Sequence, residues 1–117
     1  MKKLFIAFLV LAAAAVMIGF KPAGAHPTMD IVASNWKFTP NTITLKVGEA
    51  QELRFTSGEG VHGIKSDELG IAQTMITPGK FVTVTVTAKK AGTYVVPCSV
   101  ICGAGHPDMK LTIKVEP

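Results

Sequence analysis

Residues 82–116 read VTVTVTAKKAGTYVVPCSVICGAGHPDMKLTIKVE, and this stretch decides the fold. At its start, residues 82–87 alternate valine with threonine, and at its end residues 109–116 alternate apolar with polar side chains. Successive side chains of a β-strand point to opposite faces, so a period of two predicts a strand in each segment. The C-terminal strand is expected to place one face on a core and the other in water.

Further strands are indicated on the N-terminal side of this stretch. Apolar and polar residues alternate over 42–47, Gly48 and Glu49 predict a turn, and a second strand follows at 51–56, so we predict a hairpin there. Weaker strand patterns occupy residues 29–33, 61–65 and 93–97. Residues 66–78 show no clear pattern, and we interpret them as a loop with a short helical turn.

The number and spacing of these strands predict the fold class. About seven short strands separated by turn residues, without a segment of helical periodicity, indicate an all-β domain. Such a pattern favours a Greek-key β-sandwich of two sheets. A chain of 117 residues is long enough for one domain and too short for two well-packed cores.

The N-terminus has a different composition from the rest of the chain. Two lysines follow Met1, an uninterrupted apolar run covers residues 4–20, and Ala-Gly-Ala stands at 23–25. This order is typical of a secretory signal peptide with its cleavage site, which predicts a signal peptide over 1–25 and a mature domain over 26–117. A retained membrane anchor is the alternative, because the apolar run approaches the length of a membrane span.

Export has consequences for charge and for the cysteines. Cleavage would remove three of the 12 basic residues, which leaves nine Lys and Arg against eight Asp and Glu in a nearly neutral domain. No basic cluster remains, so nucleic-acid binding is excluded. We expect a periplasmic or extracytoplasmic location, where a pair of cysteines forms a disulfide unless another partner claims the thiolates.

One loop concentrates side chains that bind metals. Between two predicted strands, residues 97–109 carry two thiols, an imidazole and a thioether, namely Cys98, Cys102, His106 and Met109. Thiolates and thioethers are soft ligands, and together with imidazole they favour copper over calcium, magnesium or manganese. A neighbouring loop of the sandwich could supply a further imidazole, for which His62 is the candidate inside the fold.

The arrangement resembles a known family. C-S-x-x-C-G-x-x-H-x-x-M, with V-H-G upstream, resembles the binuclear copper A (CuA) domain of cytochrome c oxidase subunit II, and nitrous-oxide reductase carries a similar domain. Weaker similarities, typical of cupredoxins in general, extend over most of the mature chain. They lie at residues 35–40, 70–71, 78–80 and 91–94.

The resemblance implies a role for each ligand position. Cys98 and Cys102 would bridge two copper ions, and His62 and His106 would each bind one of them. The remaining positions implied are Met109 as a weak axial ligand and the backbone carbonyl of Val100. Many oxidases carry a glutamate in place of Val100 that also reaches a magnesium site, so valine argues against that accessory metal here.

The same resemblance implies electron transfer and not catalysis. The family passes single electrons through the copper pair, and a c-type cytochrome is the expected redox partner. A detached or accessory subunit II of a terminal oxidase is a second possibility, in which the N-terminal segment would stay as an anchor. A copper-delivery protein with an exchangeable, mononuclear site is a third.

The residues themselves leave other interpretations open. The two cysteines could form a structural disulfide, or could bind zinc together with His62 and His106, which would leave Met109 unexplained. A mononuclear blue-copper site would use one cysteine and leave the other as a spectator. Met109 could be a plain core residue, and His26 could bind copper incidentally at the new N-terminus. No role follows from the sequence for Trp36.

Overall fold

The computed structural model describes residues 27–117, so His26 and the signal peptide predicted over 1–25 lie outside the described residues. The strands are β1 (Met29–Ser34), β2 (Lys37–Thr39), β3 (Thr42–Lys46), β4 (Ala50–Ser57), β5 (His62–Ser66), β6 (Ile71–Ile76), β7 (Val82–Thr87), β8 (Gly92–Pro97) and β9 (Lys110–Glu116). A 3₁₀ helix, His106–Asp108, lies between β8 and β9. Within this part of the chain no helix is long and apolar enough to cross a membrane.

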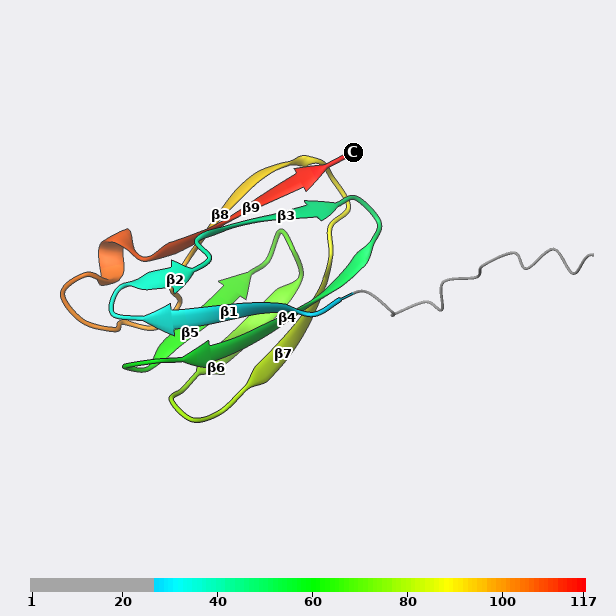
Figure 1. Cartoon of the computed structure of the whole chain (residues 1–117). Helices are drawn as coiled ribbons and strands as arrows, with labels where there is room; N and C mark the ends of the chain where they lie inside the picture. Colours follow the sequence, from blue (N-terminus) through cyan, green and yellow to red (C-terminus); the bar gives the residue numbers. More distant parts are fainter. Residues whose placement is uncertain (1–26) are drawn as a thin grey trace, which may run out of the picture.

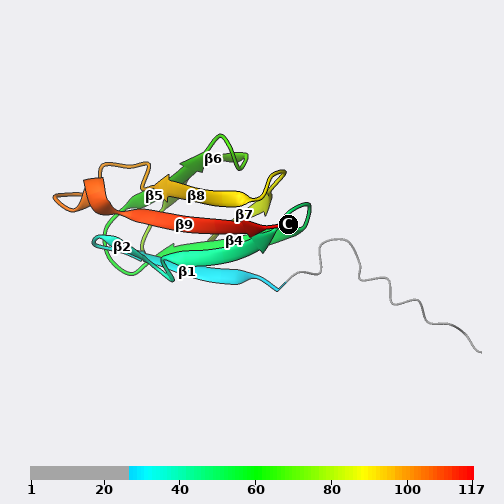
Figure 2. The same cartoon turned by 90° about the horizontal axis from the view of Figure 1, so that it is seen from above.

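The strands form a sandwich of two main sheets (Figure 1). One sheet has the order β2-β1-β4-β7, the other has the order β3-β9-β8, and β5 and β6 form a separate antiparallel pair. Within the main sheets, β1 pairs with β4 and β3 pairs with β9 in parallel. Figure 2 shows the 3₁₀ helix at one end of the sandwich and the C-terminus at the other. The predicted all-β sandwich is confirmed.

Alternating apolar residues fill the space between the sheets. Leu53 and Phe55 of β4, and Leu111 and Ile113 of β9 in the other sheet, have no exposed surface. Burying each such side chain stabilises the fold by about 1.5–3 kcal/mol. The strands expected over 82–87, at the C-terminus and at the three weaker patterns are confirmed as β7, β9, β1, β5 and β8.

The predicted hairpin of residues 42–47 and 51–56 is wrong. Both strands exist, but β3 pairs with β9 in one sheet, whereas β4 pairs with β1 and β7 in the other. The chain passes from one sheet to the other between Val47 and Gly48. The N–H of Val47 still donates to the carbonyl of Glu116 in β9, whereas the N–H of Gly48 donates to the carbonyl of Ala88, directly after β7. Gly48 has φ +78°, which suits glycine at this crossing. The alternation of apolar and polar residues within each strand is the same for a hairpin and for a crossing between sheets, so it does not distinguish the two.

The interpretation of residues 66–78 as a loop with a short helical turn is wrong for residues 71–76, which form a strand, although a turn is present before them. A turn at 67–70 leads into strand β6, which pairs with β5. The register of this pair shifts between Ile64 and Ser66, and such a bulge breaks the period of two that would reveal the strand. Strand β2 was missed for another reason, since three residues are too few to show a period.

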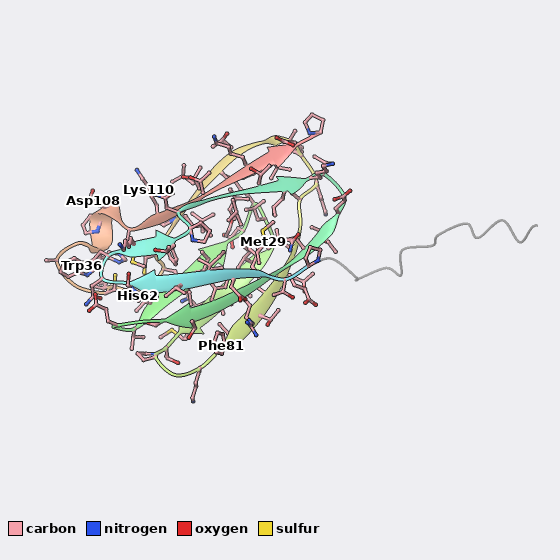
Figure 3. All side chains as sticks on the ribbon, viewed as in Figure 1. Met29, Trp36, His62, Phe81, Asp108 and Lys110 are labelled. Carbon is pink, nitrogen blue, oxygen red and sulfur yellow. The ribbon has the colours of Figure 1, made fainter. Side chains whose placement is uncertain are left out.

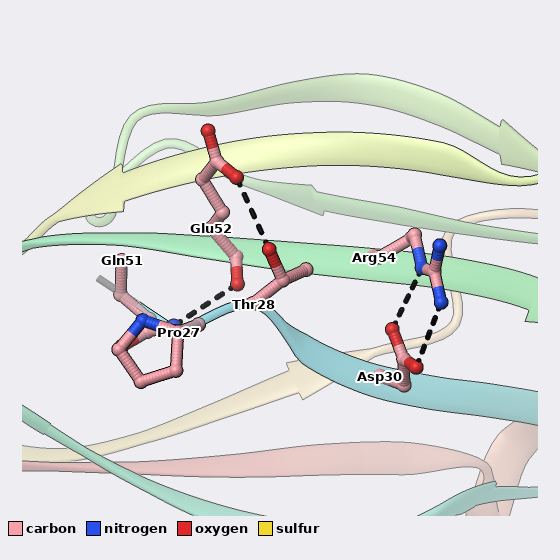
Figure 4. A network of polar contacts seen from close by, with 6 residues as sticks. All are labelled: Pro27, Thr28, Asp30, Gln51, Glu52 and Arg54. Atoms are coloured by element: carbon pink, nitrogen blue, oxygen red, sulfur yellow. Dashed lines mark hydrogen bonds and ion pairs between the residues drawn. The ribbon is translucent and has the colours of Figure 1, made fainter. Parts of the chain in front are cut away.

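Polar contacts tie β1 to β4 on the outer face of the sheet (Figure 4). Arg54 donates two hydrogen bonds to the carboxylate of Asp30, at 2.7 and 2.9 Å, and Thr28 donates to Glu52 at 3.2 Å. The Arg54 hydrogen bond lowers the pKa of Asp30, so the stabilisation from this pair is present at neutral pH and is lost as the pH falls through that pKa. Because the pair is exposed, its contribution is small.

Backbone pairing joins the two ends of the loop between β8 and β9, and we call this closed base of the loop its neck. The N–H of Cys98 donates to the carbonyl of Met109 at 2.9 Å, which places the two ends of the loop side by side. Strand β5 joins the same neck through an antiparallel bridge between Ile64 and Cys98, and Ser99 N–H donates to the carbonyl of Gly63 at 3.1 Å. The fold therefore brings β5 and the loop together at one end of the sandwich.

Truncating the centre of the core should test this packing. We expect Phe55→Ala to lower the free energy of unfolding by about 3–5 kcal/mol, because the buried ring leaves a cavity between the sheets. Thr85→Ala, on the exposed face of the neighbouring β7, should change it by no more than about 0.5 kcal/mol. Urea unfolding followed by circular dichroism measures both values, and equal losses for the two variants would contradict the assigned core.

Candidate metal centre

Two segments of the chain form the candidate centre. His62 is the first residue of β5, and the second segment is the loop of residues 98–109 between β8 and β9. In Figure 3, His62 lies at the same end of the sandwich as Trp36 and Asp108. The two segments, distant in sequence, are joined by the isolated antiparallel bridge between Ile64 of β5 and Cys98, which directly follows β8.

A pair of sulfur atoms lies at the middle of the centre. The Sγ atoms of Cys98 and Cys102 are 3.7 Å apart. The Nδ1 atom of His62 is 3.9 Å from the sulfur of Cys98, and that of His106 is 3.5 Å from the sulfur of Cys102. Each sulfur thus has one imidazole beside it, and the ligand atoms of His62 and the two cysteines all lie within 4.8 Å of one another.

Two weaker donors flank the sulfur pair, one beside each thiol. The backbone carbonyl of Val100 lies 3.2 Å from the sulfur of Cys98. The thioether sulfur of Met109 lies 3.7 Å from the sulfur of Cys102. The structure therefore brings together all six positions expected from the sequence, each beside one of the two thiols.

Burial divides the centre into an inner and an outer side. His62, Cys98 and Met109 are buried, whereas Cys102 and His106 are half-buried. The Nε2 atom of His62 lies 2.9 Å from the carbonyl oxygen of Glu59. Because a carbonyl only accepts, Nε2 donates to it, and Nδ1 is the ring nitrogen that faces Cys98.

The environment of Cys102 keeps its thiol protonated in the metal-free protein. Burial raises the pKa of Cys102 to about 11, and the hydrogen bond and charge of Cys98 act in the same direction. A metal ion that binds the Cys102 thiolate must displace this proton. Metal binding at the centre should therefore strengthen as the pH rises.

The donor set fits copper. Two thiols, two imidazoles and a thioether are soft or borderline ligands, and these favour copper among the common metals. Both cysteines are free, with sulfur atoms well beyond the bond length of about 2.05 Å of a disulfide. A zinc site of two cysteines and two histidines would give no reason for the thioether of Met109 to lie against Cys102. Met109 is also a core residue, as the alternative interpretation expects, and its thioether sulfur still faces the sulfur of Cys102.

The sequence did not predict the groups that contact the candidate ligands from outside the centre. The indole Nε1 of Trp36 donates to the backbone carbonyl of Cys102 at 2.9 Å, and the ring lies against Gly103 and Gly105. The carbonyl of Glu59 that orients His62 carries no side-chain signal at all. The only signal in the sequence is the pair Gly103 and Gly105, because glycines in the ligand loop leave room for a large ring.

Comparisons with known proteins identify relatives of this chain. Cytochrome c oxidase subunit 2 of Thermus thermophilus is 32% identical over 89 residues, which are 76% of this chain and 65% of that protein. A second cytochrome c oxidase subunit 2, also from Thermus thermophilus, is 32% identical as well, with 52% of its length covered. The chain therefore spans about half to two thirds of these relatives.

Solved structures share the fold. The periplasmic domain of subunit II of cytochrome oxidase from Bradyrhizobium japonicum superposes with a TM-score of 0.69 at 18% identity, over 76% of this chain and 83% of that one. A chain of a heme-copper terminal oxidase dimer gives 0.65 at 27% identity, over 79% of this chain and 66% of that one. The cupredoxin-like domain family matches residues 4–113. This protein belongs to the cupredoxin-like domain family.

Proposed function

We propose that this protein is an exported one-electron carrier with a binuclear CuA centre, in which two copper ions are held by the loop of residues 98–109 and His62. The observation that carries the proposal is the sulfur pair of Cys98 and Cys102, with one imidazole Nδ1 atom beside each sulfur. When bound, the copper pair supplies a reversible one-electron couple shared over both metals. The similarity to oxidase subunit 2 supports the same assignment.

Each donor of the chain has a distinct task in this proposal. When copper is bound, Cys98 and Cys102 would provide two thiolates, and His62 and His106 would each provide an imidazole. Met109 and the Val100 carbonyl provide weak donors, one beside each thiol. Because the neck of the loop is fixed by backbone pairing, the donors are preorganised, and gain or loss of an electron requires little rearrangement.

Exposed apolar side chains surround the centre and favour a protein partner. Trp36 is 42% exposed, Val61 is 43% exposed and Ile101 is 87% exposed. Trp36 contacts the ligand loop, Val61 precedes His62, and Ile101 precedes Cys102. An apolar surface over a redox centre suits transient docking, and we propose a c-type cytochrome as the electron donor. A terminal oxidase is the proposed acceptor, with this chain acting as a detached subunit II.

Copper delivery is the second candidate function. It is favoured by the half-buried position of Cys102 and His106, since ligands near the surface allow a metal to exchange. A carrier and a delivery protein differ in how long they hold copper. Slow copper release combined with a reversible redox couple favours the carrier, whereas rapid transfer to a competing chelator favours delivery.

Reconstitution with copper tests the bridging thiols directly. The protein incubated with Cu(II) and mild reductant should bind two copper ions per chain, with an electron paramagnetic resonance (EPR) hyperfine pattern of one electron shared by two equivalent nuclei. Cys98→Ser and Cys102→Ser should each abolish that pattern, because serine is a poor bridging ligand for copper. Metal analysis and frozen-solution spectra measure both properties.

The outcomes of this experiment separate the candidates. A single copper ion per chain with a mononuclear hyperfine pattern would move the assignment to a blue-copper or delivery site. Retention of the shared pattern in Cys102→Ser would show that the second thiol does not bridge. Thr85→Ala, on the exposed face of β7 away from the ligand segments, is a control in which the spectrum should remain unchanged.

Met109→Leu tests the weak axial donor. Leucine conserves most of the buried volume, so the fold should be retained with a loss of less than about 1.5 kcal/mol. Both copper ions should remain bound, while the reduction potential should shift because the thioether is gone. Voltammetry of the copper-loaded variant measures the shift. An unchanged potential would assign Met109 to the core alone.

Ile101→Lys tests the apolar docking surface. A lysine there should slow electron exchange with a small c-type cytochrome by about tenfold, because it places a hydrated charge in an apolar contact. Val95→Lys is the matched control and should have little effect, because the side chain of Val95 is exposed on β8, outside the ligand loop. Stopped-flow mixing measures the rates, and unchanged EPR spectra confirm that the centre is intact. Equal rates for both variants would place the docking surface elsewhere.

A further inference from the structure

The turn between β1 and β2 contacts both segments that form the centre. On one side, Trp36 Nε1 donates to the carbonyl of Cys102 at 2.9 Å. On the other side, the backbone N–H of Asn35 donates to the carboxylate of Glu59 at 3.2 Å, and the carbonyl of the same Glu59 accepts from His62. Two adjacent residues thus connect the ligand loop to the segment that orients His62.

Trp36 fits against the loop because the loop carries glycine where the ring lies. A Cβ atom on Gly103 would be 2.9 Å from the indole Nε1, and one on Gly105 would be 2.5 Å from Cγ of the ring. Gly103 has φ +124°, so its backbone alone favours glycine. Gly105 has φ −88° and ψ 2°, which other residues adopt, so the contact with Trp36 is the reason for glycine there.

Asn35 makes a similar close contact with the His62 segment. A Cβ atom on Gly60 would lie 2.6 Å from Oδ1 of Asn35 and 3.1 Å from Nε2 of His62. The neighbouring Ser57 donates its hydroxyl to the carbonyl of Gly60, which holds this turn in place. The β1–β2 turn is therefore packed against backbone on both sides of the centre.

We propose that Trp36 is a positioning residue that fixes the spacing between Cys102 and the His62 segment. Its ring is 42% exposed and is not part of the buried core, so its packing partner is the ligand loop. Half-buried Cys102 and His106 form the outer side of the centre, where the loop has least support from the sandwich. The consequence for copper rests on the proposed function, whereas the effect on the thiols does not.

Removal of the indole should open the loop in the metal-free protein. We expect Trp36→Phe, which loses the hydrogen bond but keeps a ring, to raise the reaction rate of the reduced cysteines with the thiol reagent DTNB about fivefold. Trp36→Ala should raise it further. Phe81→Ala is the matched control, because Phe81 is 63% exposed and stacks on Arg54 away from the loop, and its rate should equal that of the wild type.

The copper-loaded protein gives a second readout. Trp36→Phe should release copper to a chelator about fivefold faster than the wild type and should change the hyperfine splitting, since the carbonyl of Cys102 is no longer held. A merely structural role would lower the unfolding midpoint and leave the splitting unchanged. Thermal unfolding of all variants separates these two effects.

A double-mutant cycle tests the contact itself. Gly105→Ala should raise the DTNB rate in the wild-type background because the new methyl group displaces the ring, and it should add little in the Trp36→Ala background. Additive effects would overturn the proposed contact. Failure of the wild type to bind copper would overturn the proposed function while the thiol rates still test the positioning role. Wild-type thiol and copper-release rates in Trp36→Ala would overturn the positioning role alone.

Discussion

The hydrogen bond from Cys98 N–H to the carbonyl of Met109 is the constraint on which the centre depends. It extends the pairing of β8 with β9 by one step and closes the loop of residues 98–109. Cys98 and Met109 are therefore held at the boundary of the core, where both are buried. The intervening residues must form a short arch, and the 3₁₀ helix His106–Asp108 returns the chain to β9.

His62 reaches this arch through a second, long-range pairing. The bridge between Ile64 and Cys98 aligns β5 beside the neck, so His62 lies next to the thiol of Cys98. Gly63 is required at this approach, since a Cβ atom there would lie 2.6 Å from Oγ of Ser99. The ligand that is most distant in sequence is thus positioned by backbone pairing and by the absence of a side chain.

Features that depend on neighbouring residues could be predicted from the sequence, whereas features that depend on long-range pairing could not. The alternation over 82–87 identifies β7 because each strand shows its period within a few residues. The crossing at Gly48 depends on the pairing of β3 with the distant β9, and the bulge in the pair of β5 and β6 interrupts the period of two. The local alternation of residues therefore predicts neither feature. For the centre, the spacing from Cys98 to Met109 was informative, because one loop carries most of the donors.

The contacts that the sequence does not reveal are those made with backbone carbonyls. Trp36 donates to a carbonyl of Cys102, and His62 is oriented by a carbonyl of Glu59, and every residue of a chain has such a group. The support from Trp36 falls on the outer side, where Cys102 and His106 are half-buried and the sandwich supports the loop only at its neck. The proposed electron carrier would need that side near the surface, since a partner must approach its centre closely, and yet the donors must stay rigid. A ring that lies on the loop from outside meets both needs, because it supports the loop without burying it under further chain.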